Sequence, residues 1–255
     1  MTSDLVVVET RGRVLVVTMN RPQARNAINR RASEAIAEAL DRLDVDASLS
    51  VGVLTGAGGH FCSGMDLKAF LAGERVELEG RGLAGLVERP PNKPLIAAVE
   101  GYALAGGCEI ALACDLIVAA ETAEFGLPEV RRGLIAGSGG LLRLPQRIPR
   151  NIAMEYALTG RMMSARDAKG FGLVNRLVAP GAALEGALAL ASEIAANGPL
   201  AVAMTKHAID SSAGWPAAEI WTRQREILER VIASDDAHEG ARAFAEKRAA
   251  KWTGT

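Results

Sequence analysis

The sequence contains few cysteines, and their arrangement argues against two kinds of site. Only three occur among 255 residues, Cys62, Cys108 and Cys114, and no two of them form a CxxC pair. The odd number and the irregular spacing are unlike a disulfide framework or a zinc site. We therefore expect three buried, reduced thiols and no bound metal.

An excess of charge and long apolar runs are also lacking. The formal net charge is −1, which is unlike the basic character of proteins that bind nucleic acid. No stretch reaches the roughly 18 uninterrupted apolar residues that indicate a membrane span. Residues 1–4 lack the basic and apolar regions of a secretory signal. The sequence predicts a cytoplasmic globular protein with neither nucleic acid nor membrane as a partner.

Aromatic residues are scarce at 4%, although 49% of the chain is hydrophobic. This composition predicts a core built from alanine, valine, leucine and isoleucine. Glycine, by contrast, is abundant at 27 residues. Its frequency is typical of tight turns and of backbone that lies close to a ligand.

A strand, a glycine-rich turn and a helix follow one another twice, at 51–70 and at 95–114. The repetition predicts an α/β fold with short parallel crossovers. Two β-branched runs at 6–9 and 14–19 predict a preceding hairpin. Residues 73–92 are charged and irregular, and we expect a mobile surface insertion there.

From about residue 181 onward the pattern is almost purely helical. Pro199 and Pro216 each occupy a position where a helix could start. No low-complexity linker separates this region from the rest. We expect an α/β core over 1–195 and a helical tail over 196–255.

Two glutamates lie in segments that could carry chemistry. Gly106 begins a predicted helix directly after a strand, so its N–H can face a ligand oxygen, and the helix dipole favours negative charge there. Glu109 falls in the first turn of that helix, and Glu129 follows Pro128 at another predicted helix start. Each glutamate could equally serve only to stabilise a helix start, so the residues alone leave both interpretations open.

Residues 55–66 offer a third segment, in which the N–H of Met65 lies at a predicted helix start. A dinucleotide-binding turn at 55–59 is a poorer interpretation, because the G-x-G-x-x-G spacing is missing. A short-chain dehydrogenase would also need a lysine four residues after a tyrosine. Tyr102 and Tyr156 are instead followed at that distance by glycine.

Serine hydrolysis is a further alternative that the sequence disfavours. Neither Ser63 nor Ser138 lies in a G-x-S-x-G turn. His60, His207 and His238 are scattered along the chain, and we expect them on the surface or in loops.

Taken together, these segments resemble the enoyl-CoA hydratase/isomerase (crotonase) superfamily along nearly the whole chain. The matching stretches are 20–27, 55–68, 93–103, 106–109, 114–115, 125–129, 138–140 and 158–160. Several motifs in the family's order make the resemblance specific, and it favours a catalytic role for both glutamates. It implies a crotonase-like spiral of repeated β-β-α turns with a C-terminal helical region.

The resemblance implies that the N–H groups of Met65 and Gly106 hold the carbonyl oxygen of a CoA thioester. Adding water to a conjugated thioester passes through an enolate-like oxyanion, which fixed donors stabilise without reorganising. Losing one such donor typically lowers the rate about 10²–10³-fold.

In the family's hydratases one glutamate activates a water and another protonates the α-carbon. The resemblance gives these roles to Glu109 and Glu129, and it implies that Gly137 helps to place the water. Two carboxylates that share a water can hold one proton between them. Double-bond isomerases typically keep only one of the two, so the pair favours an enoyl-CoA hydratase of fatty acid or related acyl-CoA metabolism.

Two departures leave the substrate open. Met65 stands where alanine is common and could narrow the acyl pocket, and Ala105 replaces a common glycine. Residues 63–68 and 234–247 also resemble the carnitinyl-CoA dehydratase branch. A carnitinyl-CoA dehydratase, an enoyl-CoA isomerase and an acyl-CoA-binding scaffold without turnover therefore remain alternatives.

The resemblance also implies a CoA-binding surface and an oligomer. The implied CoA-binding residues are Ala24, Arg25, Ser63, Asp66, Leu67, Phe244 and Lys247. Phe244 and Lys247 match positions that often reach the nucleotide of CoA from a neighbouring subunit. Family members are usually trimers or dimers of trimers, with the acyl-CoA as substrate and no separate cofactor.

Overall fold

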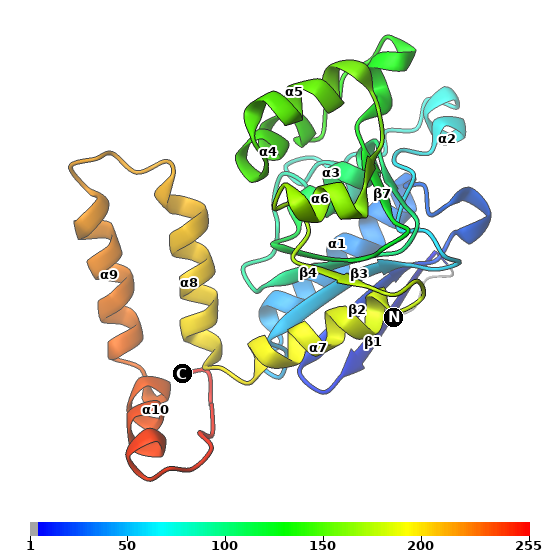
Figure 1. Cartoon of the computed structure of the whole chain (residues 1–255). Helices are drawn as coiled ribbons and strands as arrows, with labels where there is room; N and C mark the ends of the chain where they lie inside the picture. The colour runs from blue at the N-terminus through cyan, green and yellow to red at the C-terminus, as the bar shows by residue number, and fades with distance from the viewer. Residues whose placement is uncertain (1–4) are drawn as a thin grey trace.

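The structure is a computed structural model that describes residues 5–255 (Figure 1). Residues 1–4, on which the expectation of no secretory signal depends, lie outside the described part. A six-stranded sheet with the order β1-β2-β3-β4-β6-β9 forms the centre of the molecule. Its first two strands form an antiparallel hairpin, and every later pairing in it is parallel.

The strands of the central sheet are β1 (Val6–Arg11), β2 (Val14–Met19), β3 (Val51–Gly56), β4 (Leu95–Val99), β6 (Leu116–Ala120) and β9 (Arg176–Val178). A second sheet contains β5 (Tyr102–Leu104), β7 (Glu124–Gly126) and β8 (Met163–Ser164), in the order β5-β7-β8. The predicted hairpin and both strand–turn–helix repeats are confirmed, and so is the α/β fold class.

Alternating residues of the central strands face two helical layers. On β2, Leu15 and Val17 belong to the core under α1 (Arg30–Val45), whereas Val14 and Val16 pack with α7 (Ala183–Ala195). The period of two in a strand produces this division. The site described below lies in the layer on the α1 side.

The remaining helices surround or leave this core. They are η1 (Pro22–Ala24), α2 (Leu67–Leu71), η2 (Leu83–Gly85), α3 (Gly106–Ala113), η3 (Pro128–Arg132), α4 (Gly140–Arg147), α5 (Arg150–Thr159), α6 (Ala165–Gly170), α8 (Pro199–Ser212), α9 (Ile220–Ile232) and α10 (Asp235–Ala245). We call residues 199–255 the C-terminal arm, because α8, α9 and α10 extend away from the central sheet (Figure 1).

The chain bends by 106° between α7 and α8, close to the expected boundary at residue 195. Pro199 occupies the first turn of α8, as predicted. The expectation for Pro216 is wrong, because α9 begins four residues later, at Ile220. The division into a core over 1–195 and a tail over 196–255 stays a prediction. No single helix among the described residues has the length and apolar composition to cross a membrane, although α7 and α8 counted as one bent pair do.

The prediction of a mobile surface insertion over 73–92 is wrong for much of that segment. Val76, Val87 and the short helix η2 are buried, with Leu83 only 2% exposed. Glycines at positive φ fold this charged stretch back on itself, and at Gly85 (φ 60°) an added Cβ would lie 2.6 Å from Cβ of Ala37 on α1. The apolar residues between the charges therefore reach the core.

All three cysteines are buried and free, as predicted. Burial raises the pKa of each thiol to about 12. Thiols with such a high pKa carry almost no thiolate at neutral pH, so they behave as small core residues.

Candidate active site

Glu109 is a buried carboxylate on α3 that does not stabilise the start of its own helix. Its side chain is 3% exposed, and its Oε1 accepts hydrogen bonds from the N–H groups of Ser138 (2.7 Å) and Gly140 (2.9 Å). These donors come from a segment 29 to 31 residues further along the chain. No described residue bonds to Oε2, so that oxygen is available to a water.

Glycine is needed where this segment lies against the carboxylate. An added Cβ at Gly140 would lie 3.0 Å from Cγ of Glu109 and 3.0 Å from Cδ2 of Leu127. At Gly137, by contrast, an added Cβ would meet no atom within 4 Å. The structure therefore has open space beside the residue that the resemblance assigned to placing a water.

Glu129 lies in η3, with Pro128 at the start of that short helix. Its Oε2 is buried and has no hydrogen-bond partner among the described residues. Buried polar atoms almost always have a partner, so an unsatisfied one in a native fold calls for a functional explanation. A carboxyl group in this state suits a site where a proton or a ligand completes the bonding.

The pKa of both carboxyl groups is raised, and burial is the largest cause in each case. For Glu109, the N–H donors at Gly140 and Ser138 act in the opposite direction. The charge of Glu129 then raises the Glu109 pKa further, and that of Arg143 lowers it. No N–H donor from another residue offsets the burial of Glu129. The pKa of each glutamate is therefore raised above its ordinary value, and only Glu109 has backbone donors from other residues that partly offset the effect of burial.

The backbone near Met65 meets the start of α3. An added Cβ at Gly64 (φ 100°) would lie 2.9 Å from the N atom of Gly106, and one at Gly106 would lie 3.4 Å from the N atom of Met65. The two segments are held together because Cys62 exchanges backbone hydrogen bonds with the strand that precedes α3. Within residues 5–255, neither the Met65 N–H nor the Gly106 N–H has an acceptor. Two neighbouring free N–H groups can bind one anionic oxygen.

Ala105 makes the sharp turn that ends β5 and starts α3. Its φ of 51° and ψ of −127° are unusual for a residue with a side chain. Such a conformation typically costs about 1–3 kcal/mol and persists only where the surroundings enforce it. Here the Ala105 N–H donates to the carbonyl of Gly126 at 2.8 Å, which fixes the turn directly before Gly106.

The structure brings five of the implied CoA-binding residues together. Ser63 donates from its N–H to the carbonyl of Arg25 (3.0 Å) and from its hydroxyl to that of Ala24 (3.3 Å). Asp66 caps α2, whose first residue is Leu67, by accepting from the N–H groups of the first turn. The five residues therefore line one continuous piece of surface.

Sequence reasoning missed the side chains that support this surface. Arg21 forms a 2.7 Å ion pair with Asp66, and the guanidinium of Arg25 lies 5.5 Å from the ring centre of Tyr102. The same tyrosine stacks on His60 with ring centres 4.7 Å apart. Isolated arginine, histidine and tyrosine residues stand at these positions, so no periodic pattern in the sequence indicated the contacts.

Phe244 and Lys247 are not brought to this surface within one chain. Phe244 is 87% exposed on α10, and Lys247 follows that helix at φ 55°. In Figure 1, α10 and α2 lie on opposite sides of the molecule. Their part in CoA binding stays a prediction that needs a second copy of the chain.

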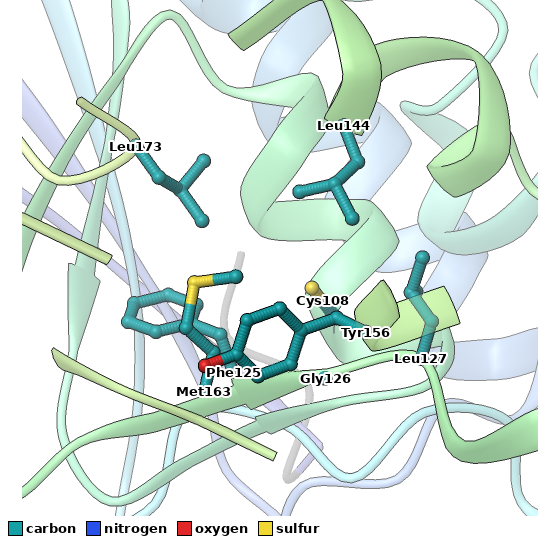
Figure 2. A pocket seen from close by; sticks show the side chains of 8 residues that line it. All are labelled: Cys108, Phe125, Gly126, Leu127, Leu144, Tyr156, Met163 and Leu173. Atoms are coloured by element: carbon teal, nitrogen blue, oxygen red, sulfur yellow. The ribbon is translucent and has the colours of Figure 1, made fainter. Parts of the chain in front are cut away.

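A small apolar cavity borders Cys108, the residue directly before Glu109 on α3 (Figure 2). Its lining residues are Cys108, Phe125, Gly126, Leu127, Leu144, Tyr156, Met163 and Leu173. The space inside is about 10 Å³, which is roughly what one water molecule needs. It is too small to accept an acyl chain. Among residues 5–255, no group of histidine, cysteine, aspartate and glutamate side chains is arranged to hold a metal ion.

Comparisons of sequence and of structure both find enoyl-CoA hydratases among the proteins similar to this chain. The family model described as enoyl-CoA hydratase/isomerase matches residues 9–255. An enoyl-CoA hydratase, EchA19, from Mycobacterium tuberculosis is 45% identical over 95% of this chain and 94% of its own length. A carnitinyl-CoA dehydratase from Proteus mirabilis is 43% identical, over 96% and 97% of the two chains.

A solved structure extends the likeness to three dimensions. The crystal structure of enoyl-CoA hydratase EchA1 from Mycobacterium marinum matches with a TM-score of 0.98 and 62% identity. The match covers 99% of this chain and 100% of the other. The arm is therefore included in the similarity, together with the core.

Proposed function

The chain belongs to the enoyl-CoA hydratase/isomerase family, and we propose that it is an enoyl-CoA hydratase. It adds water reversibly to a 2-trans-enoyl-CoA and forms a 3-hydroxyacyl-CoA. The observation that carries the proposal is the contrast between two buried glutamates. Glu109 is held by two N–H groups, whereas Glu129 Oε2 has no partner among the described residues. One is therefore suited to act as a base and the other as an acid.

In this proposal the thioester oxygen binds between the N–H groups of Met65 and Gly106. Negative charge collects on that oxygen as the double bond is attacked. Both donors are fixed by the fold before the substrate arrives, so no reorganisation is needed when the charge develops. The free N–H groups next to the strained Ala105 support this assignment.

Glu109 takes a proton from a water as the water oxygen bonds to the β-carbon. Glu129 delivers its proton to the α-carbon, so one H₂O is added in total and no electrons are gained or lost. Transfer of the proton from Glu109 to Glu129 restores the starting state. Gly137 supports this route because the space beside it is open.

Dehydration of a carnitinyl-CoA is the second candidate for the same site. It is favoured by the 43% identity to the Proteus mirabilis protein of that name. The two candidate reactions use the same catalytic residues and differ in the acyl group of the substrate. Met65 is the residue that we expect to lie beside that acyl group. A single-carboxylate isomerase and a scaffold without turnover agree less well with two retained glutamates.

The test is to incubate the purified protein with crotonyl-CoA and to follow the loss of the conjugated absorbance. A panel of longer 2-enoyl-CoA thioesters, together with crotonobetainyl-CoA, ranks the substrates by kcat/KM. Preference for a plain enoyl-CoA supports the hydratase. Preference for crotonobetainyl-CoA supports the second candidate, and binding without turnover on every thioester contradicts both.

The assembly and location are part of the same proposal. We expect a cytoplasmic homotrimer or dimer of trimers, in which the arm of one copy brings Phe244 and Lys247 to the CoA of another. The apolar surface of the arm supports this arrangement, since Trp221 is 73% exposed in the single chain. The acyl-CoA is the substrate, and no separate cofactor takes part.

A further inference from the structure

Arg143 lies at the start of α4 and makes contacts that the proposed mechanism does not use. Its Nη2 donates a hydrogen bond to the carbonyl oxygen of Val87. Its guanidinium also lies close to Gly139, where an added Cβ would be 2.2 Å from Nη1 and 3.4 Å from Cζ. A side chain at 139, where φ is 94°, would displace the guanidinium from this position.

The contact with Gly139 lies at the backbone that holds Glu109. Gly139 stands between Ser138 and Gly140, the two residues whose N–H groups donate to Glu109 Oε1. The N–H of Arg143 also donates to the Gly139 carbonyl at 3.0 Å. This backbone bond would form with any residue except proline at 143, so the guanidinium contact is what the arginine side chain adds to the segment.

The contact with Val87 reaches the other half of the site. Val87 is 3% exposed and donates through its N–H to the carbonyl of Leu83 at 3.3 Å. Cδ2 of Leu83 would lie 2.5 Å from an added Cβ at Gly106. The segment 83–87 thus covers the glycine that carries one of the two free N–H groups.

We propose that Arg143 is a positioning residue that ties the backbone holding Glu109 to the segment covering Gly106. It keeps the base and the oxyanion donors in one geometry, although it touches no reacting atom. The inference rests on the proposed hydratase function. Misplacing a catalytic group by about 1 Å can lower a rate about 10²-fold. A contact that prevents such a displacement therefore contributes to turnover.

The positive charge of Arg143 also affects Glu109 directly. It opposes the rise in the pKa of Glu109 that burial causes. The other groups that face Glu109 or Arg143 are Cys108 on α3, Cys114 directly after α3, Glu129 on η3 and Arg147 on α4. Of the two cations, only Arg143 lowers the pKa of Glu109.

The test compares Arg143→Met, Arg143→Lys and Gly139→Ala by the pH dependence of kcat and kcat/KM. Hydration needs ionised Glu109, so activity falls on the acid side as this group gains a proton. Removing the positive charge raises the Glu109 pKa, and we expect the acid limb of Arg143→Met to move to higher pH. We also expect about a tenfold loss of kcat at the alkaline plateau, with KM little changed.

The other two variants separate charge from geometry. Arg143→Lys keeps the charge but not the planar fork, so the acid limb stays in place while kcat falls. Gly139→Ala pushes the guanidinium away from Glu109, so we expect it to lower kcat and to move the acid limb in the same direction as Arg143→Met, but by less. Its effect should be much smaller in an Arg143→Met background, because the two changes break the same contact.

Arg147→Met is the matched control. Arg147 lies one turn further along α4 and also donates from Nη2 to a backbone carbonyl, that of Cys114. We expect a comparable loss of thermal stability with no movement of the acid limb. If Arg143→Met behaves like Arg147→Met in both respects, the positioning role is wrong.

A binding measurement that needs no turnover distinguishes failure of the hydratase proposal from failure of the positioning role of Arg143. Acetoacetyl-CoA can bind as its enolate, which is detected by the enolate's own ultraviolet absorbance and reports on the N–H pair directly. If the wild type hydrates no thioester, the hydratase proposal fails. Enolate binding that weakens at least about tenfold in Arg143→Met, and stays unchanged in Arg147→Met, still supports the tie. Equal binding in both variants overturns it.

Discussion

The core and the C-terminal arm differ in how much of their apolar surface they bury. All eight residues of α3 in the core are buried, whereas neither α8 nor α9 has a buried residue. The large apolar side chains of the arm point outward, with Phe244 87% and Trp221 73% exposed. The core is closed within one chain, whereas the arm presents a face that no residue between 5 and 255 covers.

The arm nevertheless has a fixed direction. The indole N–H of Trp252 donates to the carbonyl of Ala196 at 2.7 Å, and its ring lies 3.6 Å from the Cβ that would be added at Gly198 in the bend. Lys206 on α8 forms a 2.7 Å ion pair with Asp115 beside the central sheet. An arm that is held in place yet left uncovered is suited to a second copy of the chain.

This difference predicts two classes of mutant. Changes in the core should lower turnover and leave assembly intact, because the proposed reacting groups all come from it. Changes in the arm should alter assembly and CoA binding and leave the chemistry intact. Each of the following variants tests that division.

The largest effect is expected in the core. Glu109→Gln and Glu129→Gln should each lower kcat by at least about 10², because each removes a proton-transfer group, while the affinity for a CoA ligand changes little. Steady-state kinetics and calorimetric binding measure the two quantities. Activity above about half of the wild type in either variant would show that its assigned role is wrong.

The next largest effect is expected in the arm. Deleting residues 235–255 removes Phe244 and Lys247, and we expect acyl-CoA binding to weaken about tenfold or more because part of the site is lost. Light scattering of the intact protein should give a trimer or a hexamer, and the deletion should shift it to smaller species. An intact protein that is a clean monomer and still binds acyl-CoA tightly contradicts the shared site.

A smaller effect is expected at the bend. Trp252→Ala removes one hydrogen bond and the packing of a half-buried ring, which should lower the free energy of unfolding by roughly 2 kcal/mol. The control Val45→Ala removes an apolar side chain that is 83% exposed at the end of α1 in the core, and it leaves the arm unchanged. Small-angle scattering should show a change in the direction of the arm only in Trp252→Ala. If both variants scatter alike, Trp252 does not fix the arm.

The smallest effect is expected at Ala105. Replacing it with glycine relieves the positive φ but adds flexibility to the unfolded chain, so we expect a change in stability of at most about 1 kcal/mol. Thermal unfolding measures it, and kcat should stay within about twofold of the wild type. A large loss of kcat would mean that the Ala105 methyl group contributes more than the shape of the turn.

The sequence predicted much of the core because its local signals agree with its contacts. Glycine-rich turns after β-branched runs gave both strand–turn–helix repeats, and the structure brings their N–H groups at Met65 and Gly106 side by side. The burial of 73–92 could not be predicted, since its charges and glycines resemble those of a surface loop. Arg143 gave no signal either, because its hydrogen-bond acceptor is a backbone carbonyl 56 residues away.

The arm illustrates the opposite limit. Its helical pattern was predicted, but an amphipathic helix does not indicate which molecule covers its apolar face. Phe244 and Lys247 therefore remain predictions, and so does the oligomer. The described chain alone contains no surface that joins them to Arg25 or Ser63.

Incorporation of solvent oxygen tests the central claim most directly. A hydratase must place an oxygen from water on the β-carbon, whereas an isomerase only moves a proton between carbons. We predict that a 2-enoyl-CoA incubated in ¹⁸O-labelled water yields a labelled 3-hydroxyacyl-CoA, and that Glu109→Gln abolishes the labelling. Mass spectrometry that shows a shifted double bond without label would contradict the account.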